Sequence, residues 1–116
     1  MGDARDPAAL QRYRQVLVNL GHVTGYILWK KGALERLAEH LPNVSTKLIH
    51  QLMRSHVAEG GKIDQVEETR AEYKFWRFHY DLRLPVSGQR IYIETCFDDE
   101  EDPEDCVIYI VNIHLA

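Results

Sequence analysis

The sequence has no long hydrophobic run, only two cysteines and no strong excess of basic residues. No apolar stretch approaches the roughly 20 residues that a transmembrane helix needs, so we expect no contact with the membrane. The opening residues MGDARDP lack the basic and apolar segments of a secretory signal peptide, which predicts a cytoplasmic protein. Cys96 and Cys106 do not form a CxxC metal or redox motif and are expected to be reduced thiols.

The negative charge of the chain is concentrated in one segment. The formal net charge is −4, yet seven of the eight residues from 98 to 105 are acidic, and the other 108 residues carry 14 basic and 11 acidic side chains. This composition permits a local basic surface without the large basic excess of a general nucleic-acid-binding protein. We interpret the acidic segment as a solvated hairpin tip, with a cation site or a contact for a basic partner as alternatives.

The length of 116 residues predicts a single domain, with a helical part at about 6–60 and a strand part at about 72–115. Apolar residues at helical spacing predict three helices. The first begins at Asp6-Pro7 and ends at Gly21, the second covers 33–41, and the third begins at Ser45 and ends at Gly60-Gly61. Residues 22–29 are left unassigned, and residues 61–71 are predicted to be a polar connection.

The last third of the chain predicts three consecutive strands, approximately Glu72–Leu84, Arg90–Asp98 and Cys106–Leu115, with a turn at Ser87-Gly88. Three helices followed by three strands predict an α+β fold, in which the helices pack on the apolar face of a three-stranded antiparallel meander.

Alternation along each strand assigns the side chains to two faces of this sheet. One face of the first strand is apolar and the other is polar, the polar set being Phe75, Arg77, His79, Asp81 and Arg83. On the second strand, Tyr92 and Glu94 oppose Ile91 and Ile93. On the third, strict alternation groups His114 with Ile108 and Ile110 and puts Ile113 on the opposite side.

Short strings in this order resemble a known family. A helix ending in Asn19-Leu20-Gly21-His22-Val23, two further helices, and Trp76 through Ser87-Gly88-Gln89 into Ile91-Tyr92-Ile93 resemble the MqsR branch of the RelE-like toxins. The resemblance implies a small helix-plus-sheet domain that cleaves messenger RNA without a metal or other cofactor and is held inactive by an antitoxin protein.

The resemblance also implies roles for particular residues. Tyr92 falls at the position of a catalytic tyrosine, His79 at that of a glutamine, and His114 near a C-terminal lysine. This sequence departs from the pattern at Glu94, which stands where that branch has a lysine, and in the acidic insertion between the last two strands.

The chemistry of these residue types suits metal-independent RNA cleavage, which needs a base, an acid and a cation for the phosphate. We predict that His79 and His114 supply the base and acid, and that Arg77 and Arg83 bind phosphate. Tyr92 would orient the phosphate or stack on a base. Each residue also has a structural interpretation, since the arginines can form cross-strand charge pairs and Tyr92 can pack against another ring.

The sequence is therefore consistent with three functions, each of which predicts a different arrangement of these residues. A ribonuclease predicts that His79, Tyr92 and His114 converge on one exposed face beside Arg77 or Arg83. A non-catalytic interaction module predicts that these residues are dispersed or buried. A regulatory small-molecule-binding domain predicts a closed apolar pocket lined by Trp29 or Trp76. We rank the ribonuclease first because it accounts for both the element order and the polar strand face.

Overall fold

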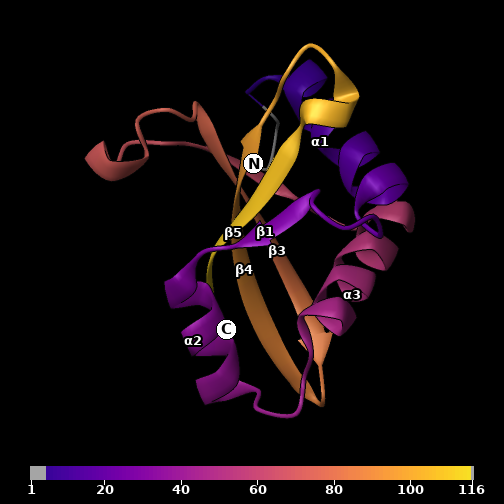
Figure 1. Ribbon diagram of the computed structural model, residues 1–116, viewed down its shortest axis with the longest axis vertical. Coiled ribbons are helices and arrows are strands. Elements are labelled where there is room, and N and C mark those ends of the chain that lie inside the picture. The colour runs from indigo at the N-terminus through magenta and orange to yellow at the C-terminus, as the bar shows by residue number, and fades with distance from the viewer. Residues whose placement is uncertain (1–4, 116) are drawn as a thin grey trace.

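Three helices make up most of the first half of the chain. The computed structural model describes residues 5–115, and in it the helices are α1 Pro7–Leu20, α2 Lys31–His40 and α3 Thr46–Ala58 (Figure 1). Two of the predicted caps are confirmed. The Asp6 carboxylate accepts a hydrogen bond from the Ala9 N–H at 3.1 Å, and the Ser45 hydroxyl accepts one from the Leu48 N–H at 3.1 Å.

The sheet differs from the predicted meander. Within residues 5–115 it has five strands, which are β1 Ile27–Trp29, β2 Asp64–Glu67, β3 Phe78–Val86, β4 Gln89–Asp98 and β5 Val107–Leu115. Their order across the sheet is β1-β5-β4-β3-β2. β1 runs parallel to β5, and the other neighbours are antiparallel. The fold is α+β, but the prediction of a three-stranded antiparallel sheet is wrong.

The two additional strands lie where the sequence gives little signal. β1 has three residues and falls in the unassigned segment, while β2 has the sequence DQVE and falls in the predicted polar connection. Strands this short do not complete an alternating pattern. These two strands therefore form by backbone pairing with a neighbouring strand, and the pattern of their side chains does not predict this pairing.

A bulge in β5 changes which side chains share a face. Glu94 of β4 pairs with Asn112, but the next residue, Thr95, pairs with Ile110, so Val111 has no direct partner. The residues after the bulge therefore exchange faces relative to strict alternation. Ile113 joins Ile110 in the core, and the prediction that put them on opposite sides is wrong.

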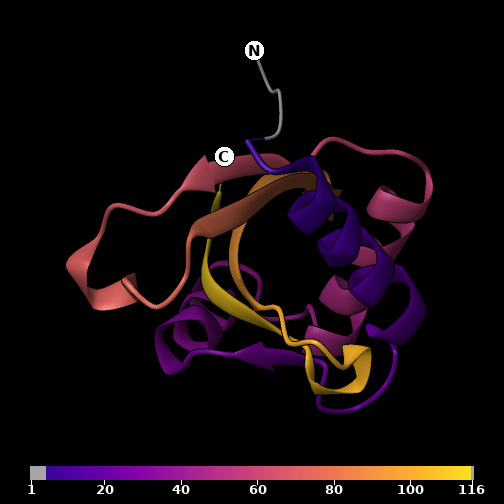
Figure 2. The ribbon, with the colours of Figure 1, turned by 90° about the horizontal axis from the view of Figure 1, so that it is seen from above.

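The hydrophobic core contains buried side chains of the sheet and of all three helices. Figure 2 shows α1 and α3 on one side of the curved sheet, while the segment between β2 and β3 projects on the other side. The Tyr13 ring of α1 is fully buried and stacks on Tyr80 of β3 at a centroid distance of 4.4 Å. Its hydroxyl is hydrogen-bonded to the Thr95 hydroxyl at 2.7 Å. α2 packs against β5.

The helices give no sign of a transmembrane element. Among residues 5–115, none of them combines the length and the apolar character that crossing a bilayer requires.

A ring-to-ring hydrogen bond ties β1 to α3 and gives the stability a pH dependence. The indole N–H of Trp29 donates to Nε2 of His50 at 2.8 Å, which requires an unprotonated Nε2, and burial lowers the pKa of His50. The unfolded chain, with a His50 pKa of about 6.5, then binds the proton more strongly than the folded chain. This contribution to stability is complete above that pKa and is lost as the pH falls below it.

We expect wild type to lose stability relative to His50→Gln on acidification from about pH 7.5 to 5.5, because glutamine can accept the indole hydrogen bond but does not titrate. Urea unfolding of both proteins at the two pH values measures this difference. Parallel pH dependence in the two proteins would show that His50 does not contribute.

Candidate functional site

A set of polar and aromatic side chains lies on the face of the sheet opposite α1 and α3, which we call the polar sheet face. The pairing of the three long strands places these side chains in adjacent rows. The set comprises His79, Asp81 and Arg83 of β3, Tyr92 and Glu94 of β4, and Asn112 and His114 of β5.

One row crosses the three strands at Tyr92. Arg83 and His114 are its direct partners on either side. The Arg83 guanidinium carbon lies 5.2 Å from the centroid of the Tyr92 ring, and the His114 ring lies 4.7 Å from it on the other side. We call Arg83, Tyr92 and His114 the cross-strand row. Its His114 is on this face because of the bulge at Val111, since strict alternation would have turned it toward the core.

Hydrogen bonds define the chemical state of the row. The Nδ1 of His114 lies 3.2 Å from the carbonyl oxygen of Leu115, which can only accept, so the neutral imidazole carries its hydrogen on Nδ1 and its lone pair on Nε2. Burial and the carboxylate of Asp81 raise the pKa of Tyr92, so its phenol stays protonated at neutral pH. Arg83 uses Nη1 to bind Asp64 and has further N–H donors for a ligand.

His79 belongs to a second cluster on the same face. Its Nδ1 lies 2.8 Å from Oδ1 of Asp81, two residues further along β3, and this hydrogen bond raises the pKa of His79. His79 is four residues from Arg83 on the same strand, which corresponds to about 13 Å. It is also separated by β4 from His114. The two histidines therefore share the face but do not converge on one point.

An ion-pair network closes the far side of this cluster. Arg70, in the segment between β2 and β3, binds Glu68 through Nη2 at 2.7 Å and also binds Glu94. These hydrogen bonds lower the pKa of Glu68 to about 2 and raise the pKa of Arg70 above its usual value. The side chains of Glu68 and Glu94 are only 1% and 9% exposed, so Arg70 compensates carboxylates that water scarcely reaches.

Aromatic residues form another group at the opposite end of the face. Trp76 packs on Tyr109 of β5 at a centroid distance of 5.8 Å, and its indole N–H donates to Asp98. The Lys30 ammonium group lies 4.8 Å from the centroid of Tyr109 and 5.8 Å from that of Trp76. Rings beside a cation suit the stacking of nucleic-acid bases near a phosphate.

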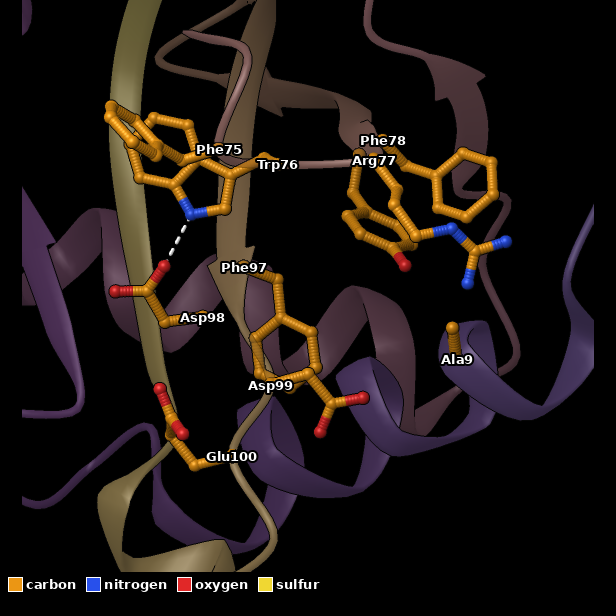
Figure 3. A pocket seen from close by; sticks show the side chains of 10 residues that line it. Ala9, Phe75, Trp76, Arg77, Phe78, Phe97, Asp98, Asp99 and Glu100 are labelled. Carbon is orange, nitrogen blue, oxygen red and sulfur yellow. Dashed lines mark hydrogen bonds between the residues drawn. The ribbon is translucent and has the colours of Figure 1, made fainter.

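Arg77 does not join the other predicted residues. It binds the Asp6 carboxylate at 3.1 Å, and its guanidinium carbon lies 4.9 Å from the Phe78 centroid. In Figure 3 its side chain stands above Ala9 of α1, at one side of an open pocket, and Trp76 and Asp98 stand at the other. β3 begins only at Phe78, so the predicted alternation does not extend back to residues 76 and 77.

This pocket differs from the one predicted for a small-molecule-binding domain. It has a volume of about 270 Å³ and is lined by Trp76 and Phe97 together with charged side chains, among them Asp98, Asp99 and Glu100. The prediction was a closed apolar pocket. The pocket found here is open, and its lining mixes aromatic side chains with charged ones.

The acidic segment folds back on α1. The Arg12 Nε donates to an Asp99 oxygen at 2.5 Å, and Nη2 donates to the carbonyl oxygen of Glu100 at 2.5 Å. Cys106 is buried beneath this contact, and both it and Cys96 are free cysteines. Burial raises the pKa of Cys96 to about 12, which keeps that thiol protonated and unreactive.

Sequence reasoning missed two cations of the polar sheet face. Arg70 lies in the predicted polar connection, and Lys30 lies between the unassigned segment 22–29 and the second predicted helix. Neither belongs to a motif, and only the path of the chain brings them to β4 and β5. Glu94 was noted for departing from the lysine of the MqsR branch, and the structure pairs it with Arg70.

Comparison with known proteins gives no family. No family model matches the chain, and neither a curated protein nor a solved structure matches it.

Proposed function

We propose that this protein is an endoribonuclease of the RelE-like toxin type that cleaves RNA at the cross-strand row by general acid–base catalysis. The observation that carries the proposal is the alignment of an arginine, a tyrosine and a histidine across three strands of one face. These three side chains supply the cation, the proton donor and the base that the reaction needs. As a toxin of this type the protein would act in the cytoplasm on messenger RNA and bind an antitoxin protein.

In the proposed reaction, Nε2 of His114 takes the proton of a ribose 2′-hydroxyl, and the 2′-oxygen attacks the adjacent phosphorus. The bond from phosphorus to the 5′-oxygen breaks as Tyr92 donates its phenolic proton to that oxygen. Arg83 binds the non-bridging oxygens, whose negative charge grows in the transition state. The products are a 2′,3′-cyclic phosphate and a 5′-hydroxyl, and proton transfer from the imidazolium through solvent restores the phenol.

His79 has no part in this reaction because of its distance from the row. We infer that Lys30, Trp76 and Tyr109 bind a flanking nucleotide by stacking and charge. This arrangement assigns substrate binding to Arg83 and to the aromatic group, while Arg77 lies outside it.

The test is cleavage of a mixed-sequence RNA in EDTA, beside DNA of the same sequence. We expect the RNA to be cut to fragments with 2′,3′-cyclic phosphate ends, identified by mass spectrometry, and the DNA to stay intact because it lacks the attacking hydroxyl. Tyr92→Phe, purified in parallel, keeps the ring but loses the proton donor, so it also controls for contaminating ribonuclease. RNA that stays intact with the wild-type protein would refute the proposal.

A non-catalytic interaction module is the second candidate, and one observation favours it. Phe75 is 84% exposed in the segment that projects between β2 and β3. An exposed aromatic ring on a projecting segment suits insertion into a partner protein. Intact RNA in the test above, together with loss of a captured partner in Phe75→Ser, would favour this function over catalysis.

A further inference from the structure

A cluster of potential metal ligands lies beside the cross-strand row, and the proposed ribonuclease reaction does not use it. The cluster consists of His79, Asp81 and Glu94, each offering one ligand atom, and these atoms all lie within 4.8 Å of one another. The pleated sheet explains the arrangement. His79 and Asp81 are two residues apart and so point to the same face, and Glu94 is the direct partner of Asp81 on β4.

The charges around this cluster do not balance. Three carboxylates are nearly inaccessible to water, with side-chain exposures of 1% for Glu68, 5% for Asp81 and 9% for Glu94. Among residues 5–115, the arginine or lysine that binds these carboxylates is Arg70. Arginine and lysine side chains of this part of the chain therefore supply one positive charge against three carboxylates. Buried charges are costly unless they are compensated, and a divalent cation supplies two positive charges.

We propose that His79, Asp81 and Glu94 form a binding site for one divalent transition-metal ion of the Zn²⁺ or Mn²⁺ kind. One imidazole nitrogen and two carboxylate oxygens make a donor set typical of these ions, whereas Mg²⁺ and Ca²⁺ prefer oxygen ligands alone. Ligands about 2.1 Å from a tetrahedral ion lie about 3.4 Å apart. His79 and Asp81 already approach to 2.8 Å. The ligand atom of Glu94 lies within 4.8 Å of theirs, so it would have to approach by up to about 1.4 Å.

Arg70 does not prevent this movement. It binds Glu94 through one oxygen, Oε2, and it is held independently by two hydrogen bonds to Glu68, of 2.7 and 2.9 Å. A glutamate can bind a cation with one oxygen and a guanidinium with the other. Arg70 would then orient Glu94 through Oε2 while the other carboxylate oxygen binds the metal.

The acidic segment at 98–105 is the competing location for an added cation. Its residues 99–105 are exposed, and Arg12 already binds Asp99. It offers carboxylates and no histidine, so it predicts weak binding with little preference for Zn²⁺ over Ca²⁺. A variant at each of these two locations shows which of them binds the added cation.

The experiment is calorimetric titration of the tag-free, EDTA-treated protein with Zn²⁺, Mn²⁺ or Ca²⁺, without RNA. We expect one Zn²⁺ per chain, a preference for Zn²⁺ over Ca²⁺, and a rise in the melting temperature with bound Zn²⁺. His79→Gln and Asp81→Asn should each weaken Zn²⁺ binding at least tenfold. The matched controls His22→Gln, in the turn after α1, and Glu101→Gln, in the acidic segment, should bind Zn²⁺ like wild type.

Two results would overturn the proposal. One is wild type that binds no Zn²⁺ at micromolar concentration. The other is unchanged Zn²⁺ binding by the His79→Gln variant. His79 is half-buried and glutamine has a similar size, so the variant should fold, and circular dichroism checks that it does. The Co²⁺ form adds a readout that needs no variant, since its visible spectrum distinguishes nitrogen and oxygen ligands from thiolates. The outcome is independent of the ribonuclease test, which is run in EDTA.

Discussion

His114→Gln should slow RNA cleavage by about 10²- to 10⁴-fold, the range typical for loss of a general base. Glutamine keeps the polarity and much of the bulk of the side chain but cannot take the 2′-hydroxyl proton at neutral pH. Because His114 lies at the end of β5 and is partly exposed, we expect little change in stability. The measurement is the single-turnover rate on a defined RNA in EDTA, which isolates the chemical step from product release.

Two other histidine variants test whether the loss of activity is specific to His114. His22→Gln alters an exposed histidine in the turn after α1 and should leave the rate unchanged. His79→Gln should retain most of the rate in EDTA because His79 lies about 13 Å along β3 from the row. Equal losses in His79→Gln and His114→Gln would instead support the two-histidine mechanism predicted from the sequence, and would require the two strands to move in the complex with RNA.

Arg70→Gln should lower the free energy of unfolding by about 3 kcal/mol, at the lower end of the range for breaking a buried ion pair. The variant leaves Glu68 and Glu94 charged, nearly inaccessible and without their guanidinium partner. The effect falls at the lower end because Arg70 itself is 36% exposed, so water can partly replace it. Urea unfolding at pH 7 measures the change. A loss below about 1 kcal/mol would mean that solvent already screens the network.

The pH dependence and a second arginine provide the controls. Arg70 holds the pKa of Glu68 at about 2, below its usual 4.5, so this stabilisation is complete above pH 4.5 and is lost as the pH falls toward 2. The difference between wild type and Arg70→Gln should therefore shrink over that interval. Arg77→Gln removes the exposed pair with Asp6 and should cost less than about 1 kcal/mol at any pH.

The pattern of apolar residues in the sequence predicted the helices and strands that are long enough to show a full repeat of that pattern. The three helices follow from caps and apolar stripes, and the turn follows from Ser87-Gly88. The structure gives these two turn residues φ values of 50° and 77°. β1 and β2 are too short to show a period, and their place in the sheet depends on pairing with β5 and β3. Local sequence contains no information on such distant partners.

The candidate site was partly predictable for the same reason. Alternation puts His79, Asp81 and Arg83 on one face because β3 is regular over those residues. Alternation fails at Arg77, because this residue precedes the strand. It also fails at His114, which follows a bulge that no residue in the sequence VIYIVNIHL predicts. The position of Arg70 beside Glu94 could not have been predicted from the sequence, because Arg70 belongs to an irregular segment whose path follows no pattern.

The parallel pairing of β1 with β5 has a consequence for how the molecule folds. Ile27 pairs with Ile108, so the chain must close a loop of about 80 residues before this edge of the sheet exists. The β3–β4 and β4–β5 hairpins close far shorter loops and can form earlier. Attachment of β1 is therefore expected to be a late event in refolding. Trp29, the last residue of β1, would report it by fluorescence as a phase slower than the formation of the hairpins.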